Sequence, residues 1–209
     1  MIPDPSAGSS LSSDAGVEGP RLLVGLGNPG EEYSGTRHNV GFAVLDLLAT
    51  RLGAAPGWLK AGGQRCGRFW QDRNRGIAML WPHTFMNLSG AAVNAARRQL
   101  ECVPAAIFVI TDDFNLDLGA LRIRPGGSHG GHNGLRSIEA ALETPDYPRL
   151  RIGVGDPGTD SVDYVLNRFR RPEQKLVDET LETASWAAED WVMGKPLDEL
   201  QARFNRRMP

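Results

Sequence analysis

One stretch near the N-terminus constrains the fold more than any other. Apolar residues 22–24 predict a buried strand, Arg21–Gly27, which runs into the turn Gly25-Leu-Gly-Asn-Pro-Gly30. Glycine permits tight or left-handed backbone and proline fixes one φ angle, so the chain can reverse sharply here. Apolar side chains then recur at helical spacing over Thr36–Leu52, which predicts a helix. A strand, a glycine turn and a helix in succession are the opening unit of an α/β fold.

Strands and helices alternate along the rest of the chain, without an internal repeat. Residues 53–64 are predicted to be a loop, and residues 155–171 to be irregular. The other predicted elements are a hairpin of Cys66–Gln71 and Ile77–Trp81, a helix after Gly90 to about Leu100, strands Ile107–Thr111 and Leu118–Arg124, a helix to about Glu143, strand Arg149–Val154, and helices Glu173–Met193 and Pro196–Arg207. We therefore expect residues 21–209 to form a single three-layer α/β domain, with a twisted, mixed and largely parallel sheet flanked by helices.

Composition narrows the class of protein. A chain of 209 residues with 41% hydrophobic and 23% charged residues is ordinary for a soluble globular domain. No apolar run approaches the ~20 residues of a membrane helix. Cys66 and Cys102 lack metal or redox spacing and indicate reduced thiols in a cytosolic protein. Residues 1–20 predict a disordered tail, because they are rich in Ser, Gly, Pro and Asp and lack the pattern of a secretory signal.

The basic residues are unusual in kind. Only Lys60, Lys175 and Lys195 of the 23 basic residues are lysines, so the others are arginines. The planar guanidinium matches phosphate oxygens well. A GC-rich coding bias is the simpler explanation of this composition. A nearly neutral domain can nevertheless bind nucleic acid where its arginines cluster.

Two kinds of group suited to chemistry stand near the ends of predicted strands. His38 begins the first predicted helix, and Asp112 and Asp113 end a strand. Parallel strands bring such ends to one edge of a sheet, so a contact between His38 and one of the two carboxylates is geometrically reasonable. A histidine held in this way can act as a general base, whereas a structural or solvated histidine is the alternative.

Asparagines occupy three of the loops at this edge. Asn28 follows the first strand, and Asn87 and Asn133 stand at the starts of predicted helices. Helix capping is one explanation. The other is that these amides orient a carbonyl group or a water molecule.

Other site classes have less support. The turn at 25–30 matches the dinucleotide pattern G-x-G-x-x-G, but the helix starts late and Asp46, the acid at the expected distance, lies within that helix. The glycine loop 125–134 lacks the G-K-[ST] ending of a P-loop. His129 and His132 lie in that loop without cysteines or an acidic cluster, so we expect no metal site. No G-x-S-x-G motif supports a covalent nucleophile.

Four stretches together resemble bacterial-type peptidyl-tRNA hydrolase. They are Leu23-Val-Gly-Leu-Gly-Asn-Pro-Gly-Glu-Glu-Tyr with Thr36-Arg-His-Asn, Thr84-Phe-Met-Asn-Leu-Ser-Gly90, the strand ending in Asp112-Asp113, and Gly130-Gly-His-Asn-Gly-Leu135 with Arg149-Leu-Arg-Ile-Gly-Val-Gly155. Each motif is modest alone, but their joint order and spacing are specific. The match extends from about Arg21 to the C-terminal helices and leaves out the N-terminal tail.

The resemblance implies a monomeric, cytoplasmic enzyme that hydrolyses the ester between a peptide and the 3′ end of tRNA, with no metal, cofactor or membrane. It makes His38 the general base, Asp112 the residue that orients it, and Asn28 a residue that positions substrate. It assigns the tRNA 3′ end and the peptide to Tyr33, Phe85, Met86, Asn87, His132 and Asn133, and the tRNA phosphate to Arg124 and Arg151.

The chain departs from the family pattern around the carboxylate. The usual sequence there is His-Asp-Glu-Leu-Asp, whereas this chain has Thr111-Asp-Asp-Phe-Asn115. An RNA-binding homologue without hydrolase activity is the main alternative. Such a protein need not retain the five polar residues implied for catalysis, all of which are present here: Asn28, His38, Asn87, Asp112 and Asn133.

Overall fold

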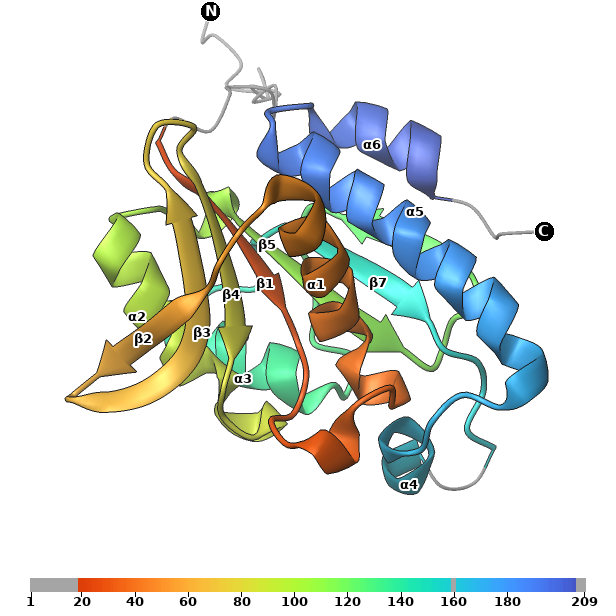
Figure 1. Cartoon of the computed structure of the whole chain (residues 1–209). Coiled ribbons are helices and arrows are strands. Elements are labelled where there is room, and N and C mark those ends of the chain that lie inside the picture. Colours follow the sequence, from red (N-terminus) through yellow and green to blue (C-terminus); the bar gives the residue numbers. More distant parts are fainter. Residues whose placement is uncertain (1–18, 159–160, 206–209) are drawn as a thin grey trace, which may run out of the picture.

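The structure, a computed structural model, describes residues 19–158 and 161–205. The predicted tail at 1–20 therefore lies outside the described residues, except for its last two. Seven strands form one sheet in the order β2-β3-β4-β1-β5-β7-β6 (Figure 1). The strands are β1 (Arg21–Gly25), β2 (Gly57–Ala61), β3 (Gln64–Asp72), β4 (Ile77–Pro82), β5 (Ile107–Asp113), β6 (Leu121–Arg124) and β7 (Arg149–Gly153).

The sheet is mixed, as predicted. Strands β4, β1, β5 and β7 are mutually parallel, while β2, β3 and β6 run antiparallel to their neighbours. The α-helices are α1 (Val40–Leu52), α2 (Ser89–Leu100), α3 (Asn133–Leu142), α4 (Ser161–Leu166), α5 (Gln174–Val192) and α6 (Leu197–Phe204). Helices α1, α5 and α6 cover one face of the sheet, and α2 and α3 cover the other (Figure 1). This is the three-layer domain that the alternating pattern predicts.

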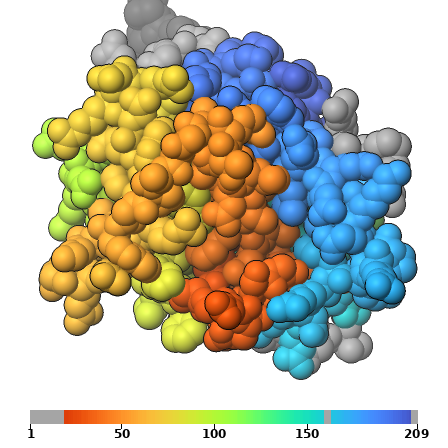
Figure 2. Space-filling model, viewed as in Figure 1, coloured from red at the N-terminus to blue at the C-terminus, as the bar shows by residue number. Residues whose placement is uncertain are grey.

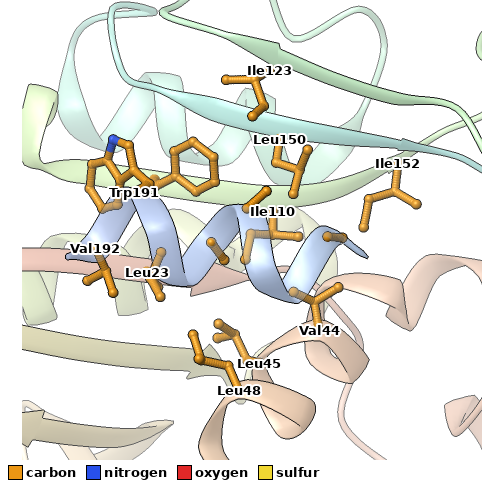
Figure 3. Packing of buried hydrophobic residues seen from close by; sticks show 14 of the residues in the cluster. Leu23, Val44, Leu45, Leu48, Ile110, Ile123, Leu150, Ile152, Trp191 and Val192 are labelled. Carbon is orange, nitrogen blue, oxygen red and sulfur yellow. The ribbon is translucent and has the colours of Figure 1, made fainter. Parts of the chain in front are cut away.

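Two hydrophobic clusters hold these layers together. One joins the sheet to α1, α5 and α6, and includes Trp191 (Figure 3), whose ring stacks on that of Phe108 with centroids 4.9 Å apart. The other joins the sheet to α2 and α3. Strand β5 is buried along its whole length because side chains on both of its faces enter these clusters. Continuous burial is typical of a central parallel strand.

Two glycines bring the start of α1 unusually close to the end of β1. A Cβ atom on Gly25 would overlap the carbonyl of Gly41, and one on Gly41 would overlap the backbone of Leu26 and Ile110. The helix can therefore lie directly against the ends of β1 and β5. Its first turn, the 3₁₀ segment η2 (Arg37–Asn39), is thereby fixed beside the end of β5.

Three local predictions were wrong. Residues 53–64 contain the strand β2, in which only the middle residue, Leu59, is buried, so the apolar signal is weak. Residues 155–171 contain α4, which is six residues long and too short for a clear helical period. The helix predicted over Thr36–Leu52 starts later, because residues 37–39 form a 3₁₀ segment and α1 begins at Val40.

Candidate active site

The centre of the site is a contact between His38 and Asp112. Nδ1 of His38 lies 2.9 Å from Oδ1 and 3.0 Å from Oδ2 of Asp112. The carboxylate is 1% exposed, whereas the imidazole is 12% exposed. Parallel pairing of β1 with β5 produces this contact, because both strands end at the same edge of the sheet. The adjacent Asp113 instead pairs with Arg151 on β7, so the structure selects Asp112 as the partner of His38.

Burial and charge act in opposite directions on this pair. Burial alone would raise the pKa of Asp112, but His38 and then His132 favour the anion and bring that pKa well below its usual range. Burial alone would lower the pKa of His38, but the charge of Asp112 and its hydrogen bond raise it above the ordinary value. Asp112 is therefore ionised at neutral pH and attracts a proton to His38.

His132 is the second histidine on Asp112. Its Nε2 lies 3.0 Å from Oδ1 of Asp112, and its Nδ1 accepts hydrogen bonds from the backbone N–H groups of Gly134 and Leu135 at 3.1 and 3.3 Å. His132 thus caps the N-terminus of α3. An Nδ1 atom that accepts two N–H groups carries no proton, so the ring is neutral and its single proton is on Nε2. Asp112 therefore accepts from two histidines.

Asn28 is held by the loop around it. The side chain of Asn39 bonds the backbone of Asn28 at both ends, with Oδ1 2.9 Å from its N and Nδ2 3.0 Å from its O. The backbone N–H of Met86 donates to Oδ1 of Asn28 at 2.9 Å. The amide NH₂ group of Asn28 is consequently the end that remains to meet a ligand.

These groups open onto a groove of about 750 Å³. Eight of the nine residues predicted for catalysis and substrate binding line it together: Asn28, His38, Phe85, Met86, Asn87, Asp112, His132 and Asn133. Phe85 is 61% exposed, which leaves its ring free to stack. The groove therefore combines a buried acid–base pair, three amides and an exposed aromatic ring.

Helix α4 borders the groove through Val165 and Leu166. It lies beside the segment that carries His38 (Figure 2), and Thr36 forms a β-bridge with Arg168. Arg37 reinforces this contact. Its guanidinium lies over the rings of Tyr164 and Phe169 and donates to the carbonyl oxygen of Arg168 at 2.7 Å.

Three predicted residues lie elsewhere. Tyr33 is half-buried in the 3₁₀ segment η1 (Glu31–Tyr33) and does not line the groove. Arg124 and Arg151 lie on β6 and β7. The register of these strands places both arginines on one face of the sheet, together with Arg122 and Arg149. Arg149 is buried and bonds the carbonyl oxygens of Ser128 and Pro145, so its role is structural.

Several contributing residues were not predicted. Asn39 was visible only as part of a motif, and its bonds to Asn28 depend on the fold of the loop. Arg136 lines the groove one helical turn after Asn133, a spacing that could have indicated it. Thr111 Oγ lies 2.9 Å from Nε2 of His132, and no sequence signal indicates that contact.

A metal ion needs ligand atoms that are free to coordinate it, and a dinucleotide site needs an acid at the end of a strand. Within the described ranges, His38, Asp112 and His132 form the one group whose possible ligand atoms lie within 4.8 Å of one another. Those atoms already bond one another, and Nδ1 of His132 bonds the backbone. The donors fit a hydrogen-bonded triad, and we assign no metal to them. Asp46 is half-exposed within α1 and does not itself end a strand, so the dinucleotide pattern is not supported.

A second groove, of about 790 Å³, lies on the other side of α4. Arg37, Tyr164, Arg168 and Arg170 are among its lining residues. It contains no histidine paired with a carboxylate, so the acid–base chemistry belongs to the first groove. Among the described residues, no helix has the length and apolarity needed to cross a bilayer.

Comparison with known proteins agrees with this geometry. The family model for peptidyl-tRNA hydrolase matches residues 22–209. The peptidyl-tRNA hydrolase of Lacticaseibacillus casei is 40% identical over 195 residues, covering 88% of this chain and all of that protein. That of Nocardia farcinica is 46% identical over 173 residues, covering 82% of this chain and 89% of the relative.

A solved structure gives the same result. The crystal structure of an Arg119Gln mutant of peptidyl-tRNA hydrolase from Acinetobacter baumannii superposes with a TM-score of 0.82 at 34% identity, over 92% of this chain and 98% of that one. These matches confirm the resemblance found in the motifs. The chain belongs to the peptidyl-tRNA hydrolase family.

Proposed function

We propose that this protein hydrolyses the ester bond that joins a peptide, or an N-blocked aminoacyl group, to the 3′ end of tRNA, and so releases free tRNA for translation. The observation that carries the proposal is the pair formed by His38 and Asp112 at the wall of an open groove. Family membership supplies the substrate class.

His38 acts as the general base. Its Nδ1–H donates to Asp112, so the free lone pair is on Nε2, on the other side of the ring. Nε2 takes a proton from a water molecule, and the water oxygen attacks the ester carbonyl. The carbonyl becomes a tetrahedral oxyanion. When it collapses, the bond to the ribose oxygen breaks, and the proton on Nε2 passes to that oxygen. No covalent enzyme intermediate is needed.

The amides of the groove complete the site. The NH₂ group of Asn28 is held toward a ligand by the bond from Met86, and Asn87 and Asn133 offer further donors from the loops on either side. Their roles are to orient the substrate carbonyl and to stabilise the oxyanion. One such donor typically contributes ~10²–10³-fold to the rate. The exposed ring of Phe85 provides a stacking surface for the 3′-terminal base, which is worth about 1–3 kcal/mol in single-stranded nucleic-acid complexes.

The tRNA body binds the arginine face of β6 and β7. Arg124 and Arg151 lie on that face, as does the half-buried Arg122. Contacts to phosphate position a nucleic acid without reading its sequence. The proposal also includes Tyr33 as a contact to the tRNA end from outside the groove, and action as a monomer in the cytoplasm, both implied by the family resemblance.

The decisive test is turnover of diacetyl-lysyl-tRNA by His38→Ala. We expect kcat to fall by ~10²–10⁴-fold, the usual contribution of a general base. Binding of tRNA, measured by filter retention, should stay within twofold because His38 makes no phosphate contact. Near-normal turnover of the variant would remove His38 from the mechanism. Absence of turnover in the wild-type protein, with tRNA binding retained, would favour the RNA-binding homologue.

A further inference from the structure

Thr111 lies directly behind the catalytic pair, at the position where the family usually has histidine. It is 1% exposed. Its hydroxyl oxygen lies 2.9 Å from Nε2 of His132 and 3.3 Å from the carbonyl oxygen of Asp112. The mechanism above makes no use of this hydroxyl, although it touches a side chain that holds Asp112.

The protons around His132 can be assigned. Nδ1 accepts from two backbone N–H groups, so the one ring proton is on Nε2. That proton faces two acceptors at nearly equal distance, Oδ1 of Asp112 at 3.0 Å and Oγ of Thr111 at 2.9 Å. The proton of the Thr111 hydroxyl has the carbonyl oxygen of Asp112 as its acceptor. Thr111 therefore competes with Asp112 for a single hydrogen-bond donor.

We propose that Thr111 is a positioning residue that shares the ring proton of His132 with Asp112, and so leaves more of the carboxylate charge available to His38. The chain of contacts runs from Thr111 through His132 and Asp112 to His38. The proposal for Thr111 rests on the proposed function, in which His38 is the base.

The proposal predicts that removing the Thr111 hydroxyl and removing the His132 donor have opposite effects on His38. Without the Thr111 hydroxyl, the His132 proton points wholly at Asp112, disperses its charge and weakens its hold on His38. Without the His132 donor, Asp112 loses one of its two hydrogen bonds and holds the His38 proton more strongly. A purely structural role for Thr111 gives no reason for opposite signs.

The surrounding charges do not change in these variants. They are Arg136 on α3, the ion pair of Asp113 on β5 with Arg151 on β7, and the ion pair of Arg37 in η2 with Glu173 at the start of α5. A shift in the titration of His38 is therefore assigned to the contact that was altered.

The experiment is a nuclear magnetic resonance titration of the His38 ring in the full-length enzyme, without substrate. Thr111→Val keeps the shape and removes the acceptor, and we expect the titration midpoint of His38 to fall by about 0.5 pH units, the size of one modest hydrogen bond. Thr111→Ser keeps the oxygen and should titrate like the wild type. His132→Asn keeps a residue that caps helices but is too short to reach Asp112, and its midpoint should rise.

Kinetics provide a second readout. With diacetyl-lysyl-tRNA, Thr111→Val should lower kcat by up to about threefold, the rate equivalent of 0.5 pH units, and change KM by less than twofold, while Thr111→Ser should restore kcat. Thermal unfolding identifies variants that fold, and Thr111→Ala replaces the valine variant if that one does not.

An unchanged midpoint and kcat in the folded Thr111→Val or Thr111→Ala variant would overturn the proposal. A midpoint that moves upward, in the same direction as in His132→Asn, would overturn it as well. Because the titration needs no substrate, it separates this inference from the proposed function. If His38 is not the base, turnover by His38→Ala will stay near normal, whereas the titration of His38 in the Thr111 variants will be unaffected by that failure.

Discussion

His38 and Asp112, the proposed base and its partner, affect each other's protonation in ways that can be measured. Asp112 is buried and ionised, and it raises the pKa of His38 above the ordinary value. A general base works only in its neutral form, so the activity falls as the pH drops through that pKa. The pH dependence of activity therefore tests whether Asp112 raises the pKa of His38.

We expect kcat/KM of the wild type to fall on the acid side with a midpoint above ~6.5, the usual pKa of histidine. Asp112→Asn removes the charge that raises the pKa of His38 but leaves its burial, which lowers it. The midpoint of the variant should therefore lie at lower pH, with a reduced maximum rate. A pH–rate profile from pH 5 to 9 measures both. A midpoint equal to or above that of the wild type would show that Asp112 does not set the charge state of His38.

Arg151 should contribute to tRNA binding, and its ion pair with Asp113 should limit that contribution. The two side chains pair, and Arg151 is 32% exposed, so part of its charge faces solvent. Arg151→Ala should weaken binding of full-length tRNA and lower the slope of log Kd against log salt by about one. It should leave a short aminoacyl-nucleotide fragment unaffected.

Asp113→Asn is the matched control for Arg151. It frees the guanidinium, so it should tighten tRNA binding and steepen the salt dependence. Equal effects of Arg151→Ala on the full substrate and on the fragment would remove the assignment of Arg151 to the tRNA body.

At the scale of elements, the packing of helix α1 places His38, in the 3₁₀ segment η2 just before the helix, beside Asp112. The close approach at Gly41 leaves no room for a methyl group against the backbone of Leu26 and Ile110. In an exposed helix, alanine is more favourable than glycine by about 1 kcal/mol. Here overlap with backbone should reverse that sign.

We expect Gly41→Ala to lower the free energy of unfolding by about 1–3 kcal/mol, the typical cost of overpacking. It should also lower kcat at least tenfold because the first turn of the helix carries His38. Urea denaturation and turnover check these effects. Gly57→Ala is the control, since nothing lies within 4 Å of the added methyl group. A variant as stable and active as the wild type would mean that the helix can move outward without cost.

Arg37 holds helix α4 beside η2, the segment that carries His38. It is 3% exposed, stacks on two rings, and donates to backbone carbonyls and to Glu173. Breaking such a buried pair typically costs about 3–5 kcal/mol. Arg37→Met should therefore destabilise the protein, speed amide exchange over residues 163–170 and raise KM. Arg170→Ala removes the exposed partner of the same Glu173 and should leave the melting temperature nearly unchanged.

The sequence allowed the main elements to be predicted where their apolar period was strong. Strand β5 and helix α5 lie close to their predicted bounds, because one begins with four consecutive apolar residues and the other has a clear buried stripe. Strand β2 was missed because it is short and mostly exposed, and helix α4 because six residues are too few for a clear helical period. Local pattern gives little information where few side chains are buried.

Part of the site could likewise be predicted from the sequence, and part could not. Spacing and strand order made a contact of His38 with one acid reasonable, but the choice of Asp112 over Asp113 depends on which way each side chain points from β5. Alternation along a strand sends neighbours to opposite faces, so a shift of one residue would exchange their roles. The double use of Asp112 by two histidines could not be predicted, because His132 comes from a loop whose path no periodic pattern describes.

For the whole molecule, the order of strands determines when the site can exist. Strand β5, which carries the acid, lies between β1 from the start of the chain and β7 from much later. His38 and Asp112 are 74 residues apart in sequence, and His132 joins from the loop that leads toward β7. During refolding, both halves of the chain must pair before the carboxylate is enclosed. Recovery of hydrolysis should therefore lag behind recovery of the helical circular dichroism signal. The activity would then measure when β5 has paired with both β1 and β7.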